Sequence, residues 1–140
     1  MQLLLKSGDL GPKWFHIALR SLVLLADNDK LLKSNEIADI LQEDSTFVRK
    51  ILSELAKSNY VQTYSGRYGG YKLQCDLEQV TVKDIYMALG NSAITSTAST
   101  GSTGTETFIS LIILKAETEF QNTLGQYTLA QIVKYKNVEC

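Results

Sequence analysis

A glycine-rich stretch, YVQTYSGRYGGYKL, constrains the fold of this chain more than any other segment. Residues 61–64 and 71–73 are rich in residue types that favour β-strands, and the glycines between them permit the positive φ angles of a tight turn. This pattern predicts a two-stranded hairpin. Its glycines would make a slim tip, from which Arg67 and Tyr68 project.

Apolar residues at helical spacing predict helices over residues 14–26, 35–42 and 45–58, all before the hairpin. Ser34 is the expected N-cap of the second helix. In that helix we expect three side chains to turn inward, those of Ile37, Ile40 and Leu41. Helices followed by a glycine-rich hairpin predict a mainly α fold with a small β-hairpin wing, a winged helix-turn-helix.

The third predicted helix, with Asp44 or alternatively Ser45 as its N-cap, is strongly two-sided. Its apolar stripe, which we expect to be buried, consists of Val48, Ile51, Leu52 and Leu55. Its opposite face is basic and can form hydrogen bonds, and it consists of Thr46, Arg49, Lys50, Ser53 and Lys57. Such a face is either simply solvated or the surface that binds an anionic partner.

The distribution of charge weakly favours an anionic partner at the front of the chain. Residues 1–75 contain 10 Lys and Arg against 8 Asp and Glu, whereas residues 76–140 contain 4 against 7. A slim basic tip can approach a phosphate backbone or enter a minor groove, where a bulky loop cannot. The alternative is an ordinary tight turn in which Arg67 is incidental.

After the hairpin, Thr81 and Asp84 have the spacing of a capping box and open a predicted helix over residues 82–89, which we expect Gly90 to close. The stretch 91–107 is rich in Ser, Thr, Gly and Ala and predicts a flexible loop. We therefore divide the chain into a winged-helix DNA-binding domain (1–90), this loop, and a dimerisation helix with a C-terminal helix (108–140).

The helix predicted over residues 108–123 is apolar on more than one face. One stripe consists of Ile109, Ile112, Ile113, Ala116 and Phe120, and Leu111 and Leu114 lie on another side. A domain of this size has few other elements that could cover both apolar sides of the helix. We therefore interpret the helix as the interface of a homodimer. The alternative is an internal core helix. Thr128 is the expected cap of a last helix over residues 129–135.

The stretches VRKILSELAKSNYVQTYSGRYGGYKL and VTVKDIYMALG resemble the Rrf-two family of bacterial winged helix-turn-helix regulators. FISLIILKAETEF and YTLAQIV are similar to the family's dimerisation helix and the element after it. The resemblance implies a homodimeric regulator that binds double-stranded operator DNA, usually a repressor. Two-fold symmetry would match an inverted-repeat operator.

The resemblance also implies which residues contact DNA. The third helix would enter the major groove with Thr46, Arg49 and Lys50, and we include Ser53 from the same face. The wing would contact the minor groove with Gly66, Arg67, Tyr68 and Gly69. Ser65 stands where the family often has an arginine, so a minor-groove arginine role falls to Arg67.

Cluster-binding members of the family carry three cysteines after the fourth helix, whereas residues 91–107 of this chain contain none. Thiolates normally hold iron–sulfur clusters, so we predict no cluster, no metal and no other cofactor. Cys75 and Cys140 are the only cysteines, and Cys75 is a possible redox thiol in a regulator that acts as a thiol switch.

Other functions find little support in the sequence. His16, the only histidine, lies in an apolar helical pattern, and no catalytic triad, metal motif or phosphate loop is present, so we expect no enzyme activity. We also expect no signal peptide and no membrane partner, and a cytoplasmic location. A winged helix that binds another protein is the alternative to a DNA-binding regulator.

Overall fold

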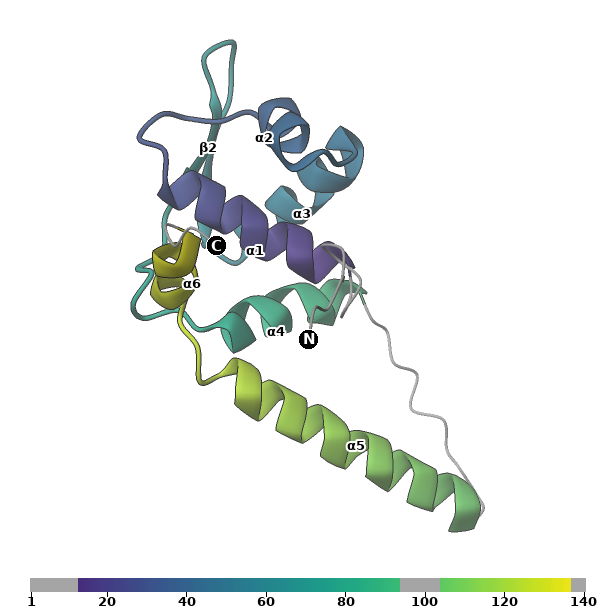
Figure 1. Cartoon of the computed structure of the whole chain (residues 1–140). Helices are drawn as coiled ribbons and strands as arrows, with labels where there is room; N and C mark the ends of the chain where they lie inside the picture. Colours follow the sequence, from purple (N-terminus) through teal and green to yellow (C-terminus); the bar gives the residue numbers. More distant parts are fainter. Residues whose placement is uncertain (1–12, 94–103, 137–140) are drawn as a thin grey trace.

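The computed structural model describes residues 13–93 and 104–136 and is mainly helical, with one antiparallel two-stranded sheet (Figure 1). This confirms the predicted fold class, a winged helix-turn-helix. In chain order the elements are α1 (Lys13–Ala26), α2 (Ser34–Leu41), α3 (Ser45–Lys57), β1 (Val61–Tyr64), β2 (Gly70–Leu73), α4 (Val82–Ala93), α5 (Gly104–Leu124) and α6 (Leu129–Lys136).

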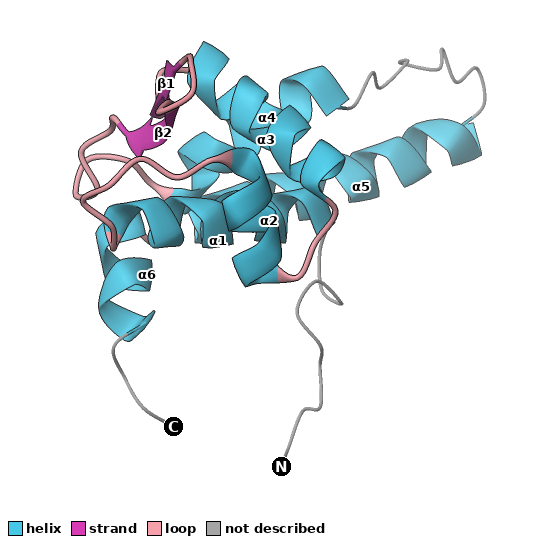
Figure 2. Cartoon of the chain, turned by 90° about the horizontal axis from the view of Figure 1, so that it is seen from above, coloured by secondary structure: helices cyan, strands magenta, loops and turns pink. Residues whose placement is uncertain are grey.

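The core lies where the first four helices meet, and α6 closes one side of it. Ile17 of α1, Ile37 of α2, Leu52 of α3 and Ile85 of α4 are completely buried there, and Leu129 adds the first turn of α6. Figure 2 shows the hairpin at one side of this helical unit and α5 extending at the other. The unit therefore presents α3 and the hairpin on a rigid, close-packed support.

The helix-turn-helix pair α2–α3 confirms the predicted cap of α3 and corrects that of α2. The Asp44 carboxylate accepts a hydrogen bond from the Phe47 backbone N–H at 2.9 Å, as an N-cap does. Ser34, however, is the first helical residue, and Lys33 holds the N-cap position. The Lys33 N–H donates to Glu36 Oε1 at 2.8 Å, so the glutamate supplies the cap in place of a serine hydroxyl.

One inward-facing side chain of α2 was predicted wrongly. Ile37 and Leu41 are buried, but Ile40 is 57% exposed and Ala38 is buried in its place. Positions 37, 38 and 41 follow the helical i, i+1, i+4 pattern of one face, and residue 40 falls beside that face. The apolar character of Ile40 was not enough to predict its burial, because single exposed apolar side chains are common.

The hairpin forms where the glycine-rich stretch predicts it, with Val61 opposite Leu73 and Tyr64 opposite Gly70. The loop before α2 extends this sheet, because Leu32 and Tyr71 exchange backbone hydrogen bonds of 3.2 and 2.8 Å. At Gly70, which has φ of 154°, a Cβ atom would lie 2.8 Å from the Leu32 carbonyl oxygen. Glycine is therefore required for the close approach of the two segments.

Both predicted caps of the later helices are confirmed. The Thr81 N–H donates to the Asp84 carboxylate at 2.9 Å, and the Asp84 N–H donates to Thr81 Oγ1 at 3.1 Å, which makes a reciprocal capping box for α4. Thr128 forms the same arrangement with Gln131, its N–H donating to Gln131 Oε1 at 2.8 Å. These two caps lie side by side, since Thr81 and Thr128 form a β-bridge.

Gly90 does not end α4, which continues to Ala93. A glycine terminates a helix when it takes a left-handed conformation, and Gly90 has no positive φ. A Cβ atom on Gly90 would lie 4.0 Å from the ring of Trp14, so this glycine sits inside the helix against α1.

The predicted loop over residues 91–107 is therefore too long at both ends. Residues 91–93 belong to α4, and α5 begins at Gly104 instead of at Phe108. Glu106, an acidic residue in the first turn, favours this earlier start. Residues 94–103 of the predicted loop, and Cys140, lie outside the described residues.

Candidate nucleic-acid interface

The basic face of α3 lies on the surface, opposite the stripe that anchors the helix. Val48, Leu52 and Leu55 are completely buried. The residues predicted for DNA contact on this helix all lie at the surface, and they are Thr46, Arg49, Lys50 and Ser53. The apolar face thus anchors the helix in the core, and the opposite face stays exposed.

Ion pairing leaves most of this positive charge available. In the described part of the chain, Lys13 and Arg20 pair with Glu43, and Lys57 pairs with Glu54. Arg49 and Lys50 form no ion pair there. Lys57, at the end of the face, is held 3.3 Å from Glu54, so its charge is partly offset, and the available charge is concentrated in the first half of α3.

The wing tip presents one cation and one aromatic ring. Arg67 is exposed, and Tyr68 is 84% exposed, which is unusual for a large aromatic side chain without a partner surface. Gly66 is also exposed and has φ of 99°, a conformation that other residues rarely adopt. Gly66 thus shapes the tip, and the next two residues, Arg67 and Tyr68, supply its charged and aromatic side chains.

Gly69 differs from the other predicted wing residues because it is buried inside the turn. Its N–H donates to the Gly66 carbonyl at 3.1 Å, and a Cβ atom there would lie 2.0 Å from the Tyr64 carbonyl oxygen. Gly69 therefore closes the turn, whereas Gly66, Arg67 and Tyr68 are exposed at the tip.

Lys33 is a residue of this surface that the sequence reasoning missed. From the start of α2, its ammonium group donates a hydrogen bond to the backbone carbonyl of Arg67 at the wing tip. The two residues are 34 positions apart, so no local pattern could have revealed the contact. Its sequence signal is only a lysine beside a predicted helix start, which is too common to be specific.

Cys75, the thiol singled out in the sequence, follows β2 and is partly buried. Burial raises the pKa of this thiol above its usual value, a backbone hydrogen bond offsets part of the effect, and the Asp76 carboxylate raises the pKa further. Burial also raises the pKa of Tyr60, helped by Asp84 and Cys75. A raised thiol pKa lowers the fraction of reactive thiolate at neutral pH.

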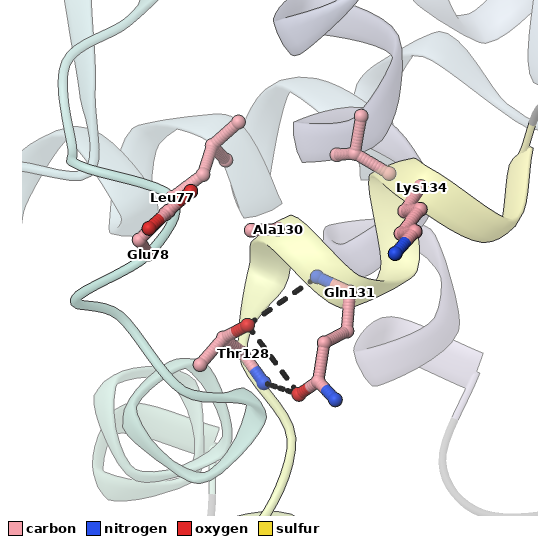
Figure 3. Close-up of a pocket in the computed structure, with 7 residues that line it drawn as sticks. Leu77, Glu78, Thr128, Ala130, Gln131 and Lys134 are labelled. Carbon is pink, nitrogen blue, oxygen red and sulfur yellow. Dashed lines mark hydrogen bonds between the residues drawn. The ribbon is translucent and has the colours of Figure 1, made fainter.

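A surface groove of about 610 Å³ lies away from α3 and the wing, between the turn at residues 77–78 and α6 (Figure 3). Its polar residues Thr128 and Gln131 already hydrogen-bond to each other, as the dashed lines show. Glu78 and Lys134 also line the groove, and none of the predicted site residues does.

Helix α5 differs from the helices of the core because none of its described residues is buried. Every residue predicted for the dimer interface is exposed in the single chain: Ile109, Ile112, Ile113, Ala116 and Phe120. Leu111 and Leu114, on the other side, are 56% and 61% exposed. An exposed apolar surface of this extent is typical of an interaction site.

Comparison with known proteins places these features in a family. Residues 13–135 match the Rrf2 (Rrf-two) family, which is described as iron-dependent transcriptional regulators. The chain belongs to the Rrf2 family. It is a DNA-binding transcriptional regulator, as the resemblance implied.

Individual relatives agree with the family. The HTH-type transcriptional regulator NsrR of Oceanobacillus iheyensis is 28% identical over 134 residues, which are 87% of this chain and 88% of the relative. A candidate HTH-type regulator of Aquifex aeolicus is 34% identical over 76 residues, so the match spans 54% of this chain and only 53% of that relative. The crystal structure of a candidate transcriptional regulator from Lactobacillus plantarum is similar with a TM-score of 0.71, 26% identity and 89% coverage of both chains.

The iron in the Rrf2 family description does not fit the donor atoms of this chain. Iron–sulfur clusters are held mainly by three or four thiolates, and the whole sequence contains two cysteines and one histidine. Within residues 13–93 and 104–136, no group of three or more His, Cys, Asp or Glu side chains could hold a metal ion. In the same residues, no helix is long and apolar enough to span a membrane.

Proposed function

We propose that this Rrf2-family regulator binds an inverted-repeat operator as a homodimer and represses transcription there. The observation that carries the proposal is the pairing of two exposed surfaces in one chain. One is the basic face of α3, where Arg49 and Lys50 form no ion pair in the described residues, together with the wing tip. The other is the apolar helix α5, which has no buried residue.

Each half of the DNA-contacting surface has its own role. Arg49 and Lys50, near the N-terminal end of α3, would reach base edges or phosphates in the major groove, with Thr46 and Ser53 as hydrogen-bonding neighbours. Arg67 at the wing tip would enter the adjacent minor groove, where the slim turn permits close approach. Tyr68, on the same tip, would pack against the sugar–phosphate backbone.

The extent and position of the apolar surface support the homodimer. Ile109, Ile112 and Ile113 leave about half or more of their surface exposed, and fully burying such side chains contributes about 1.5–3 kcal/mol each. A second copy of the same helix, related by a two-fold axis, would cover this apolar surface with an identical one. Two recognition helices would then read two half-sites, which supplies the specificity that one winged helix lacks.

We propose no enzymatic function and no thiol switch. The raised pKa of the Cys75 thiol argues against redox sensing, because sensor cysteines are exposed and have lowered pKa values. A winged helix that binds only protein is a weaker alternative, because Arg49, Lys50 and Arg67 are cations with no acidic partner in the described region.

A mobility-shift assay on the DNA upstream of the chain's own gene tests the proposal. Arg49→Ala, Lys50→Ala and Arg67→Ala should each weaken binding while the protein stays folded, and Lys134→Ala on α6 is the matched control for removal of a surface cation. Removing one phosphate contact from each subunit should reduce the salt slope by about 0.9 per contact, whereas removing a base contact should cost about 1–3 kcal/mol and relax sequence choice.

If all three α3 and wing variants bind as tightly as the control, the assigned surface is wrong. Repression is tested separately by transcription from the same promoter in a purified system. Added protein should reduce the transcript, and an increase would show that the regulator activates.

A further inference from the structure

Helix α5 is attached to the DNA-binding unit near one of its ends. Residues 104–116 of α5 are all exposed, and Figure 1 shows this part of the helix extending away from the rest of the fold. Side-chain contacts with α4 are made by Glu117 and Phe120, in the second half of the helix. Helix α5 is therefore attached to α4 near its C-terminal end, and its N-terminal part extends away from the fold.

Tyr86 of α4 is the centre of that attachment. Its ring packs edge-on against Phe120 of α5, with ring centroids 5.2 Å apart. Burial, and after it the nearby Glu117 carboxylate of α5, raise the pKa of the Tyr86 hydroxyl. On its other sides the Tyr86 ring stacks on Trp14 at 5.7 Å and meets Phe15 edge-on at 5.2 Å. One side chain thus connects α1, α4 and α5.

Further contacts support the same end of the helix. Glu117 accepts a hydrogen bond from the Gln121 amide at 2.9 Å, which orients its carboxylate. Beyond the helix, the Val82 N–H donates to the Tyr127 carbonyl at 2.8 Å. The backbone bond fixes where α5 ends, and the Tyr86 contacts fix its tilt.

Small changes of this tilt are large on the scale of DNA. Ile112 lies eight residues before Phe120, or about 12 Å along the helix at 1.5 Å per residue. A tilt of about 10° would move that point by about 2 Å, and two-fold symmetry would change the separation of the two DNA-binding units by about twice as much. One base pair corresponds to about 3.4 Å along the duplex.

We infer that Tyr86, through Phe120 and Glu117, determines the half-site spacing that the dimer accepts. This inference rests on the proposed dimeric, operator-binding function. Tyr86 is a positioning residue, since it lies neither on the α3 face nor at the wing nor among the interface residues of α5. Its replacement should change which spacing is preferred while leaving the recognition of each half-site unchanged.

The test uses the full-length protein and a series of inverted repeats whose spacer is varied one base pair at a time. The wild-type protein should prefer one spacer by about tenfold or more over its neighbours. Tyr86→Leu, which keeps an apolar side chain but removes the ring and the hydroxyl, should reduce that preference to about twofold or move it by one base pair. Tyr86→Phe, which keeps the ring, should have a smaller effect in the same direction.

Tyr135→Leu is the matched control, because this tyrosine is 73% exposed on α6 and should leave the spacer profile unchanged. Affinity for DNA with a single half-site, and dimer mass by light scattering, should be the same for all variants. If Tyr86→Leu does not fold, Tyr86→Phe and Glu117→Gln carry the test. A wild-type spacer profile in these folded variants would overturn the inference.

The outcomes separate the inference from the proposed function. If the wild-type protein binds no inverted repeat at any spacing, the proposed operator fails. If it has a sharp spacing preference that the variants retain, only the role of Tyr86 fails.

Discussion

The winged-helix unit and α5 belong to one chain but differ in how far their apolar side chains are buried. In the unit the helices bury apolar stripes, and residues such as Ile17, Leu52 and Ile85 have no exposed surface. In α5, a helix of 21 residues, no side chain is buried although many are apolar. The comparison shows that the unit buries its own apolar side chains, while the apolar side chains of α5 stay exposed in the single chain.

The largest effect expected from this comparison is at the middle of α5. Ile113→Glu would bury a carboxylate at the proposed dimer interface, and an unpaired buried charge costs about 3–5 kcal/mol. We expect a monomer that no longer binds the operator cooperatively. Because Ile113 is 63% exposed in the single chain, circular dichroism of this variant should still show a folded helical protein.

A matched truncation in each region sharpens the same comparison. Leu52→Ala in α3 should lower the free energy of unfolding by about 2–5 kcal/mol, since it leaves a cavity in a close-packed core. Ile113→Ala should change the unfolding free energy of dilute, monomeric protein by less than about 0.5 kcal/mol, as exposed substitutions do. Urea titrations measure both, and equal decreases would mean that Ile113 packs against its own chain.

A smaller effect is expected at the contact between α2 and the wing. Lys33→Met removes the hydrogen bond to the Arg67 carbonyl and should weaken operator binding by about 1 kcal/mol, because the wing tip is no longer anchored to α2. Lys30→Met, at an exposed lysine of the same loop, is the control.

The salt dependence of binding distinguishes two roles of Lys33. An unchanged salt slope in Lys33→Met indicates that the lysine positions the wing, and a slope reduced by about 0.9 per subunit indicates a direct phosphate contact. Identical affinities of the Lys33→Met and Lys30→Met variants would contradict both roles.

The smallest effect concerns the pH dependence of Cys75. In a Cys140→Ser background, alkylation of folded Cys75 by iodoacetamide at neutral pH should be slower than in urea, because burial raises the thiol pKa and lowers the thiolate fraction. By linkage, this group's contribution to stability should be complete below the ordinary thiol pKa and decrease as the pH rises through the raised value. Alkylation faster than in urea would revive the thiol-switch hypothesis.

Local sequence patterns predicted the elements that local chemistry controls. The reciprocal caps at Thr81 and Thr128, the Asp44 cap and the glycine-rich hairpin all depend on residues close to each other in the sequence. The stripe of α3 depends on helical spacing, which a sequence also displays directly. These features were therefore predicted correctly.

Predictions failed where the structure of a residue depends on a contact with a distant residue or on its backbone conformation. Gly90 was expected to end α4, but it packs against Trp14 of α1, a tertiary contact that the local sequence does not show. Gly69 resembles the other wing glycines in sequence, yet the approach of the Tyr64 carbonyl buries it. The contacts of Lys33 with Arg67 and of Tyr86 with Phe120 join residues at least 34 positions apart, beyond the reach of any local pattern.

The central claim, that α5 joins two chains into one operator-binding unit, is tested most directly by light scattering of the protein alone and in complex with an inverted-repeat duplex. At micromolar concentration the account predicts twice the mass of the chain for the free protein, and two chains on each duplex in the complex. A monomer that binds one asymmetric site with a single chain would contradict both the interface at α5 and the two-fold operator.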